Sequence, residues 1–321
     1  MRHRSIQIVP LIGYVVLSVF VLLLFGSSFY VAWDVHVIIG GVVLMVIMVG
    51  LLSQIALEYR RLPYVDPAPL FSQANLFNFG AVFLGAISTY IINIDVGLGA
   101  VTASGLVGVI SALVAPAYGV PLYCGSFVGM TSAQFLLDHV ELGIAGLIAG
   151  AIYVITTGVY DGFGGKLGTI AFAGCITTGM CLGREFMGVP IPPWRIAGQI
   201  ILYAVLAAVI TRWLSINRGH RAVMASGAVG LIGGLLLPRL YPVGAGDTLA
   251  VVVICASFAG MSATSRFPKL WPMLIVGLFT GIAFVYSMPV LGGAGGKLGT
   301  LALGAGLATR GYMPLLKGAA K

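Results

Sequence analysis

Long apolar runs recur from one end of this chain to the other, and they limit its possible folds more than any other feature. Hydrophobic residues make up 59% of the 321 positions and charged residues 8%, so a water-soluble globule could not bury the apolar surface. Runs of about 17 to 25 apolar residues fit helices that cross a bilayer. We therefore predict an all-α polytopic membrane protein. Its hydrophobic segments, about 12 in number, are 8–31, 35–57, 75–94, 98–114, 118–137, 141–160, 166–183, 195–215, 222–237, 247–263, 269–290 and 297–312.

The basic residues between these segments predict an orientation. The first run, Ile8 to Trp33, is longer than the apolar core of a signal peptide, so we interpret it as a retained helix. If the N-terminus is cytoplasmic and every segment crosses, 13 of the 17 Lys and Arg residues fall on the cytoplasmic side. The exceptions are Arg184, Arg195, Arg239 and Lys297. This distribution predicts insertion in the cell membrane with both termini in the cytoplasm.

The polar stretch after the second segment divides the chain. It contains charged residues and three prolines, which cannot continue a helix, so we expect a cytoplasmic linker over residues 61–74. Before it lies a two-helix unit, residues 1–60. After it we expect two five-segment units, residues 75–190 and 191–321.

The two five-segment units resemble each other in sequence. Cys124–Met130 matches Cys255–Met261, and Gly164–Thr169 matches Gly295–Thr300 with an identical GGKLGT, each pair being 131 residues apart. Several matches in register indicate an internal duplication. Because five is an odd number of crossings, the second copy would enter the membrane from the opposite side, which makes the pair an inverted repeat.

An inverted repeat is typical of carriers that open alternately to the two sides of a membrane. The sequence therefore favours a permease, either a secondary carrier or a channel, for a small polar or anionic solute. The alternative is a non-transporting membrane-embedded subunit that anchors or assembles a larger complex.

The GGKLGT segments are the predicted substrate site. Serial glycines interrupt a helix, and the N–H groups of the next helix start, together with a lysine, suit an anion or a polar solute. The candidate residues are Gly165, Lys166, Thr169, Gly296, Lys297 and Thr300. In the alternative interpretation both segments are surface turns whose lysines reach lipid headgroups. They are not Walker A loops, because the spacer before Gly-Lys is missing.

Two further candidates lie near these segments. Ser126 and Ser257 occupy matching positions, where their hydroxyls line a path or, alternatively, bond between packed helices. Asp161 precedes Lys166 by five residues and has no acidic counterpart in the second copy. We expect it to couple an ion or to hold Lys166, unless it is a loop carboxylate at the cytoplasmic mouth.

Other functional classes are less compatible with the sequence. The motifs GxSxG and HExxH are absent, so we do not expect an enzyme. The four cysteines and four histidines form no ligand spacing for a metal or haem, and we expect no cofactor. The basic residues are dispersed in loops, which argues against nucleic acid. The expected partners are membrane lipids and the solute, and a homo-oligomer or other membrane subunits are compatible with this assignment.

Overall fold

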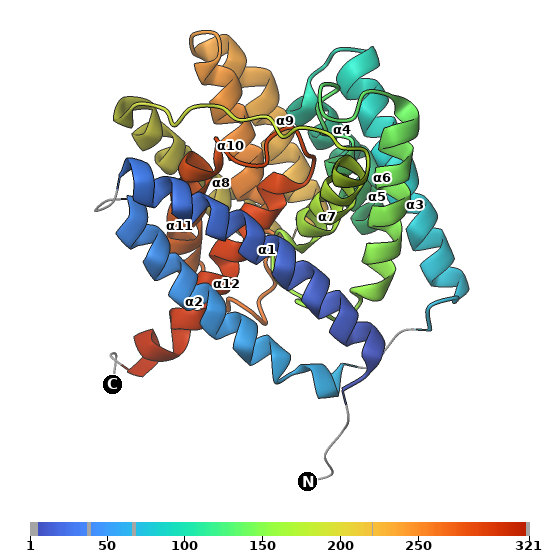
Figure 1. The fold of residues 1–321 in the computed structure, drawn as a ribbon, viewed down its shortest axis with the longest axis horizontal. Coiled ribbons are helices and arrows are strands. Elements are labelled where there is room, and N and C mark those ends of the chain that lie inside the picture. The colour runs from blue at the N-terminus through green and yellow to red at the C-terminus, as the bar shows by residue number, and fades with distance from the viewer. Residues whose placement is uncertain (1–5, 37–39, 66–68, 220, 319–321) are drawn as a thin grey trace.

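The computed structural model is a bundle of helices (Figure 1). It describes residues 6–36, 40–65, 69–219 and 221–318, so part of the predicted linker and both extreme termini lie outside the description. The α-helices in these ranges are α1 (Ile8–Val35), α2 (Val42–Tyr59), α3 (Gln73–Tyr90), α4 (Ala100–Val114), α5 (Gly119–Val128), α6 (His139–Ile155), α7 (Lys166–Cys181), α8 (Trp194–Asn217), α9 (Ala222–Leu240), α10 (Ala245–Gly260), α11 (Pro272–Ser287) and α12 (Lys297–Gly318). No strand occurs in the described ranges; a single antiparallel bridge joins Met187 and Gly292.

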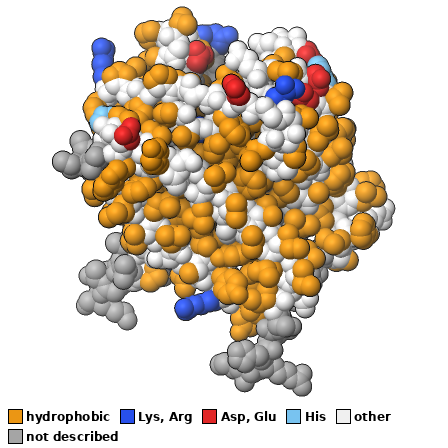
Figure 2. Space-filling model, in the orientation of Figure 1, with side chains coloured by type: hydrophobic (Ala, Val, Ile, Leu, Met, Phe, Trp, Pro, Cys, Tyr) orange, Lys and Arg blue, Asp and Glu red, His pale blue; other side chains and the backbone are white. Residues whose placement is uncertain are grey.

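The prediction of an α-helical protein suited to a membrane is confirmed. Five helices (α1, α2, α3 with its π-helical end Ile91–Asp95, α8 and α9) are long and apolar enough to cross a bilayer. Large apolar side chains are exposed along most of them, and Figure 2 shows hydrophobic side chains over much of the visible face. Charged side chains gather mainly toward its upper edge. Such a surface is compatible with a medium as apolar as lipid.

One predicted segment, 118–137, is a continuous helix only in its first part. α5 ends at Val128, and turns lead from Gly129 to Asp138, where α6 begins with the Asp138 carboxylate accepting a hydrogen bond from the Glu141 N–H. Apolar residues continue beyond the break, with Thr131, Ser132 and Gln134 among them, so composition did not reveal where the helix ends. α5 is thus a short helix of 10 residues that ends inside the protein.

Glycines allow several helices to approach closely. A Cβ at Gly129 would lie 2.5 Å from the carbonyl oxygen of Ala86 in α3. A Cβ at Gly260 would lie 2.7 Å from the carbonyl oxygen of Ala208 in α8. Small residues at helix contacts are how membrane helices pack without a hydrophobic driving force. The two contacts place α5 on α3 and α10 on α8 in the same way.

The N-terminal helices lie across one face of the bundle, in front of α7, α11 and α12 in Figure 1. Glu58, near the end of α2, accepts hydrogen bonds of 2.7 and 3.0 Å from both terminal nitrogens of Arg266, which precedes α11. Tyr312 of α12 donates to the carbonyl of Val46 in α2. The first two helices therefore pack directly against the rest of the chain. In Figure 1, α1 begins and α12 ends at the lower edge.

Candidate functional site

The two GGKLGT segments each start a helix through a left-handed glycine. Gly165 has φ 90° and precedes α7, and Gly296 has φ 83° and precedes α12. Side chains disfavour this backbone conformation, so glycine is required for the chain to turn into the helix at these points.

The starts of α7 and α12 contact each other in the interior. A Cβ on Gly168 would lie 2.5 Å from the Cα of Gly299, and a Cβ on Gly299 would lie 2.5 Å from the Cα of Gly168. Gly165 also approaches the backbone of Leu303, and Gly296 approaches the matching part of α7. The first turns therefore run antiparallel, and the two helices continue from this crossing in opposite directions.

A hydroxyl from the other half of the chain holds each glycine segment. The Gly164 N–H donates to Ser262 Oγ at 3.0 Å, and the Gly295 N–H donates to Thr131 Oγ1 at 3.1 Å. The sequence predicted unpaired N–H groups at the helix starts that follow these two glycines. In the first turn of α12, the Gly299 N–H donates to the Gly296 carbonyl at 3.0 Å.

Both lysines reach back to the end of the preceding helix. Lys166 Nζ donates to the Thr156 carbonyl at 2.8 Å, just beyond α6. Lys297 Nζ donates to the carbonyls of Ser287 and Val290 at 2.6 and 2.5 Å, at the end of α11. A cation at a helix N-terminus is unfavourable, whereas the C-terminal carbonyls of another helix attract it. Each ammonium thus ties two helices together.

The two lysines differ in their counterions. Asp161 Oδ1 lies 2.5 Å from Lys166 Nζ, so Asp161 holds Lys166, which is one of the two roles predicted for it. The position 131 residues later is Gly292, and Lys297 has no carboxylate partner among the described residues. Lys297 therefore lacks the carboxylate partner that Lys166 has, and its bonds are to backbone carbonyls alone among the described residues.

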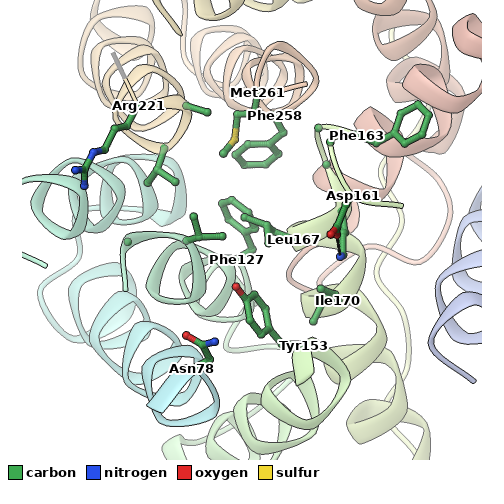
Figure 3. A pocket seen from close by; sticks show the side chains of 18 of the residues that line it. Asn78, Phe127, Tyr153, Asp161, Phe163, Leu167, Ile170, Arg221, Phe258 and Met261 are labelled. Carbon is green, nitrogen blue, oxygen red and sulfur yellow. Dashed lines mark hydrogen bonds and ion pairs between the residues drawn. The ribbon is translucent and has the colours of Figure 1, made fainter. Parts of the chain in front are cut away.

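Cavity 1, the larger of two cavities at these segments, has a volume of about 600 Å³. Its polar lining includes Asn75, Asn78, Asp161, Lys166 and Arg221 (Figure 3). Arg221 and Asp161 are exposed, so the cavity reaches the protein surface.

Cavity 2 has a volume of about 370 Å³ and is lined by residues 292–298, including Gly296 and Lys297. The other polar lining residues are Ser132, Asp247, Thr248 and Ser287. Asp247 is exposed, and so is Val189, in the segment between α7 and α8 that extends over this region. Cavity 2 therefore also reaches the surface.

The cavities lie at opposite ends of α4. Ala100 and Val101, at its start, line cavity 2, whereas Ala112 and Pro116, at and beyond its last turn, line cavity 1. A helix of 15 residues is about 22 Å long. Lys166 lines cavity 1 and Lys297 lines cavity 2, and among the described residues neither lysine lines both.

One aromatic pair lines both cavities. Phe127 of α5 and Phe258 of α10 are, among the described residues, the two that the linings share. Their ring centroids are 4.3 Å apart, and both side chains are 1% exposed. Figure 3 shows the two rings facing each other.

The predicted hydroxyl residues lie behind these cavities. Ser126 shares a hydrogen bond of 2.9 Å with Ser104 of α4, and Ser257 shares one of 2.8 Å with Ser226 of α9. All four side chains are fully buried. They join neighbouring helices, and in the described structure Ser126 and Ser257 contribute to neither cavity lining.

The threonines of the two segments are likewise buried. Thr169 donates to the Gly165 carbonyl and Thr300 to the Gly296 carbonyl, each at 3.4 Å. These bonds lie within the first turn of α7 and of α12.

Sequence reasoning did not single out Phe127 and Phe258, which line both cavities, although both belong to the matched Cys-x-Ser-Phe-x-Gly-Met motif. It also missed the Glu58–Arg266 pair, whose members are 208 residues apart. The useful signal was that both positions, 131 residues apart in matching segments, are phenylalanine. The residue type alone suggested only a packing role for Phe127 and Phe258.

Among the described residues, no group of three or more His, Cys, Asp or Glu side chains could hold a metal ion. Comparisons of the chain with protein-family models, curated proteins and solved structures find no match. The function therefore has to be argued from the cavities and the residues that line them.

Proposed function

We propose that this protein is a membrane permease for a small anionic solute, with the two cavities as its entrances from opposite sides. The observation that carries the proposal is that two surface-reaching cavities end on one shared pair of side chains. A permeation pathway requires access from both sides of the membrane to one central barrier.

The membrane arrangement in this proposal is the predicted one. All twelve segments cross or enter the bilayer, the last ten form an inverted five-plus-five repeat, and both termini are cytoplasmic. In support, bonds recur 131 residues apart: Cys124 Sγ donates to the Leu167 carbonyl and Cys255 Sγ to the Leu298 carbonyl, both at 3.2 Å. The antiparallel crossing of α7 and α12 is also what inverted copies would produce. Short helices that meet inside the bilayer are common in such carriers.

Charge favours an anion as the solute. Lys297 carries an ammonium without a carboxylate partner among the described residues, at the edge of an otherwise largely apolar cavity. An unpaired cation in a low-dielectric site attracts a counterion strongly. We expect an anion to bind beside Lys297 in cavity 2, and less tightly in cavity 1, where Asp161 neutralises Lys166.

Flux into liposomes that contain the purified protein tests this function. A panel of inorganic anions and small carboxylates should include at least one that enters faster than through protein-free liposomes. Lys297→Gln should weaken its binding about tenfold, which corresponds to about 1.4 kcal/mol. Lys269→Gln is the matched control, because Lys269 is exposed and lines neither cavity in the described structure.

The alternative of a non-transporting subunit predicts a different result. The protein would then co-purify with stoichiometric partners and would move none of the anions when reconstituted alone. That combination would overturn the permease proposal.

A further inference from the structure

Among the described residues, the linings of the two cavities meet at the matching phenylalanines of α5 and α10. Beyond this pair, Met261 and Tyr153 line cavity 1, while Met130 lines cavity 2. A solute that passed from one cavity to the other would have to pass Phe127 and Phe258.

The rings leave no passage in the described state. With centroids 4.3 Å apart and an interplanar angle of 45°, they are in van der Waals contact, so no water molecule fits between them. An apolar constriction without water is a high barrier for an ion, which would have to lose its hydration shell.

Neighbouring groups hold the pair in place. The Tyr123 ring lies edge-on to Phe127 at 4.5 Å and to Phe258 at 6.0 Å. Its hydroxyl shares a hydrogen bond of 3.0 Å with Ser226 of α9. Ser257, directly before Phe258, bonds to the same Ser226. The predicted hydroxyl residues therefore act here by fixing the helices that carry the rings.

We propose that Phe127 and Phe258 form the gate of the permeation pathway, and that the structure shows this gate closed. The proposal rests on the proposed function and specifies where its barrier lies. Separation of α5 from α10 would part the rings and join the cavities. Truncation of both rings should connect the cavities without any such movement.

Accessibility of two engineered cysteines from either side tests the gate without knowledge of the solute. Met261→Cys reports on cavity 1 and Met130→Cys on cavity 2, each in a Cys181→Ser background because Cys181 is the exposed native cysteine while the other three are buried. A membrane-impermeant maleimide is applied to one side of oriented vesicles at a time.

With an intact gate, each reporter should react from one side, and the two reporters from opposite sides. In the Phe127→Ala/Phe258→Ala variant, labelling of each reporter from its far side should become about tenfold faster or more. The matched control is Phe20→Ala/Phe172→Ala, which removes an aromatic pair between α1 and α7 that lines neither cavity in the described structure. Should the double alanine variant not fold, Phe127→Leu/Phe258→Leu provides a smaller opening for the same measurement.

Three results are informative about different claims. Unchanged one-sided labelling in a folded gate variant overturns the gate. Labelling of both reporters from the same side with the native rings in place overturns the two-sided pathway and with it the permease. If the two reporters react from opposite sides with the native rings, and each reacts from both sides after ring truncation, the gate is supported. This holds even if no anion in the panel is transported.

Discussion

Cavities 1 and 2 are lined by residues at matching positions, yet they differ in charge and polarity. Tyr153 in cavity 1 corresponds to Phe284 in cavity 2, and Asp161 corresponds to Gly292. Both cavities keep their lysine. The common features therefore belong to the framework, namely the glycine turns, the lysine bonds and the phenylalanines, whereas the differences affect how each cavity receives a charged solute.

Substitution of the matching framework glycines should destabilise the fold equally at both positions. This is the largest expected effect. Gly165→Ala and Gly296→Ala each place a Cβ against the backbone of the other glycine segment, in a conformation with positive φ. Strain of about 1–3 kcal/mol adds to that overlap, so we expect both variants to lose most folded protein. Gly198→Ala, where an added Cβ meets nothing within 4 Å, should be neutral.

Yield and melting temperature in detergent are the measurements for these three variants. If one of the pair were tolerated while the other abolished folding, the two glycine turns would not be equivalent.

The positions that follow α5 and α10 differ more sharply. Arg266 occupies the position that matches Phe135, and its guanidinium is bound by Glu58, whose side chain is 6% exposed. Glu58→Gln leaves the Arg266 charge buried without a counterion and should cost about 3 kcal/mol. Arg61→Gln is the control: Arg61 also contacts Glu58 but is 53% exposed, so its loss should cost under about 1 kcal/mol.

Thermal unfolding distinguishes the two variants. Equal destabilisation by Glu58→Gln and Arg61→Gln would show that the N-terminal helices are not anchored through Arg266.

These examples also show what the sequence could predict. The existence of the helices followed from apolar runs, because lipid demands them whatever the tertiary contacts are. The break after Val128 did not, since apolar residues continue beyond it and the turn is held by a distant bond, from the Gly295 N–H to Thr131. The GGKLGT segments were found by repetition. The direction of Lys166 was not predictable, because its carbonyl partner lies at the end of another helix.

Removal of Asp161 should make cavity 1 resemble cavity 2. Asp161→Asn takes away the carboxylate beside Lys166 but keeps a group of the same size. We expect binding of the transported anion at cavity 1 to become up to about tenfold tighter, since the ammonium is then free of its counterion. Asp34→Asn is the matched control: Asp34 is exposed and lines neither cavity in the described structure.

The anion affinity of each variant is measured by the shift in melting temperature with anion concentration. An unchanged affinity in Asp161→Asn would show that Lys166 serves only to join α6 and α7.

The smallest expected effect concerns the serine pairs behind the gate. Ser104→Ala removes one hydrogen bond, to Ser126, whereas Ser226→Ala removes two, to Tyr123 and Ser257. Bonds of this kind between membrane helices contribute about 0.6 kcal/mol on average, so Ser226→Ala should cost roughly twice as much as Ser104→Ala. Tyr123→Phe, which removes only the hydroxyl, should match Ser104→Ala.

Melting temperatures of the three variants decide this point, and the maleimide assay adds a second readout. Because Ser226 fixes both Tyr123 and the residue before Phe258, its loss should also raise far-side labelling of the Met130→Cys reporter slightly, while Ser104→Ala should not. Equal effects of the two serine variants in both assays would mean that the gate is held by ring packing and not by these bonds.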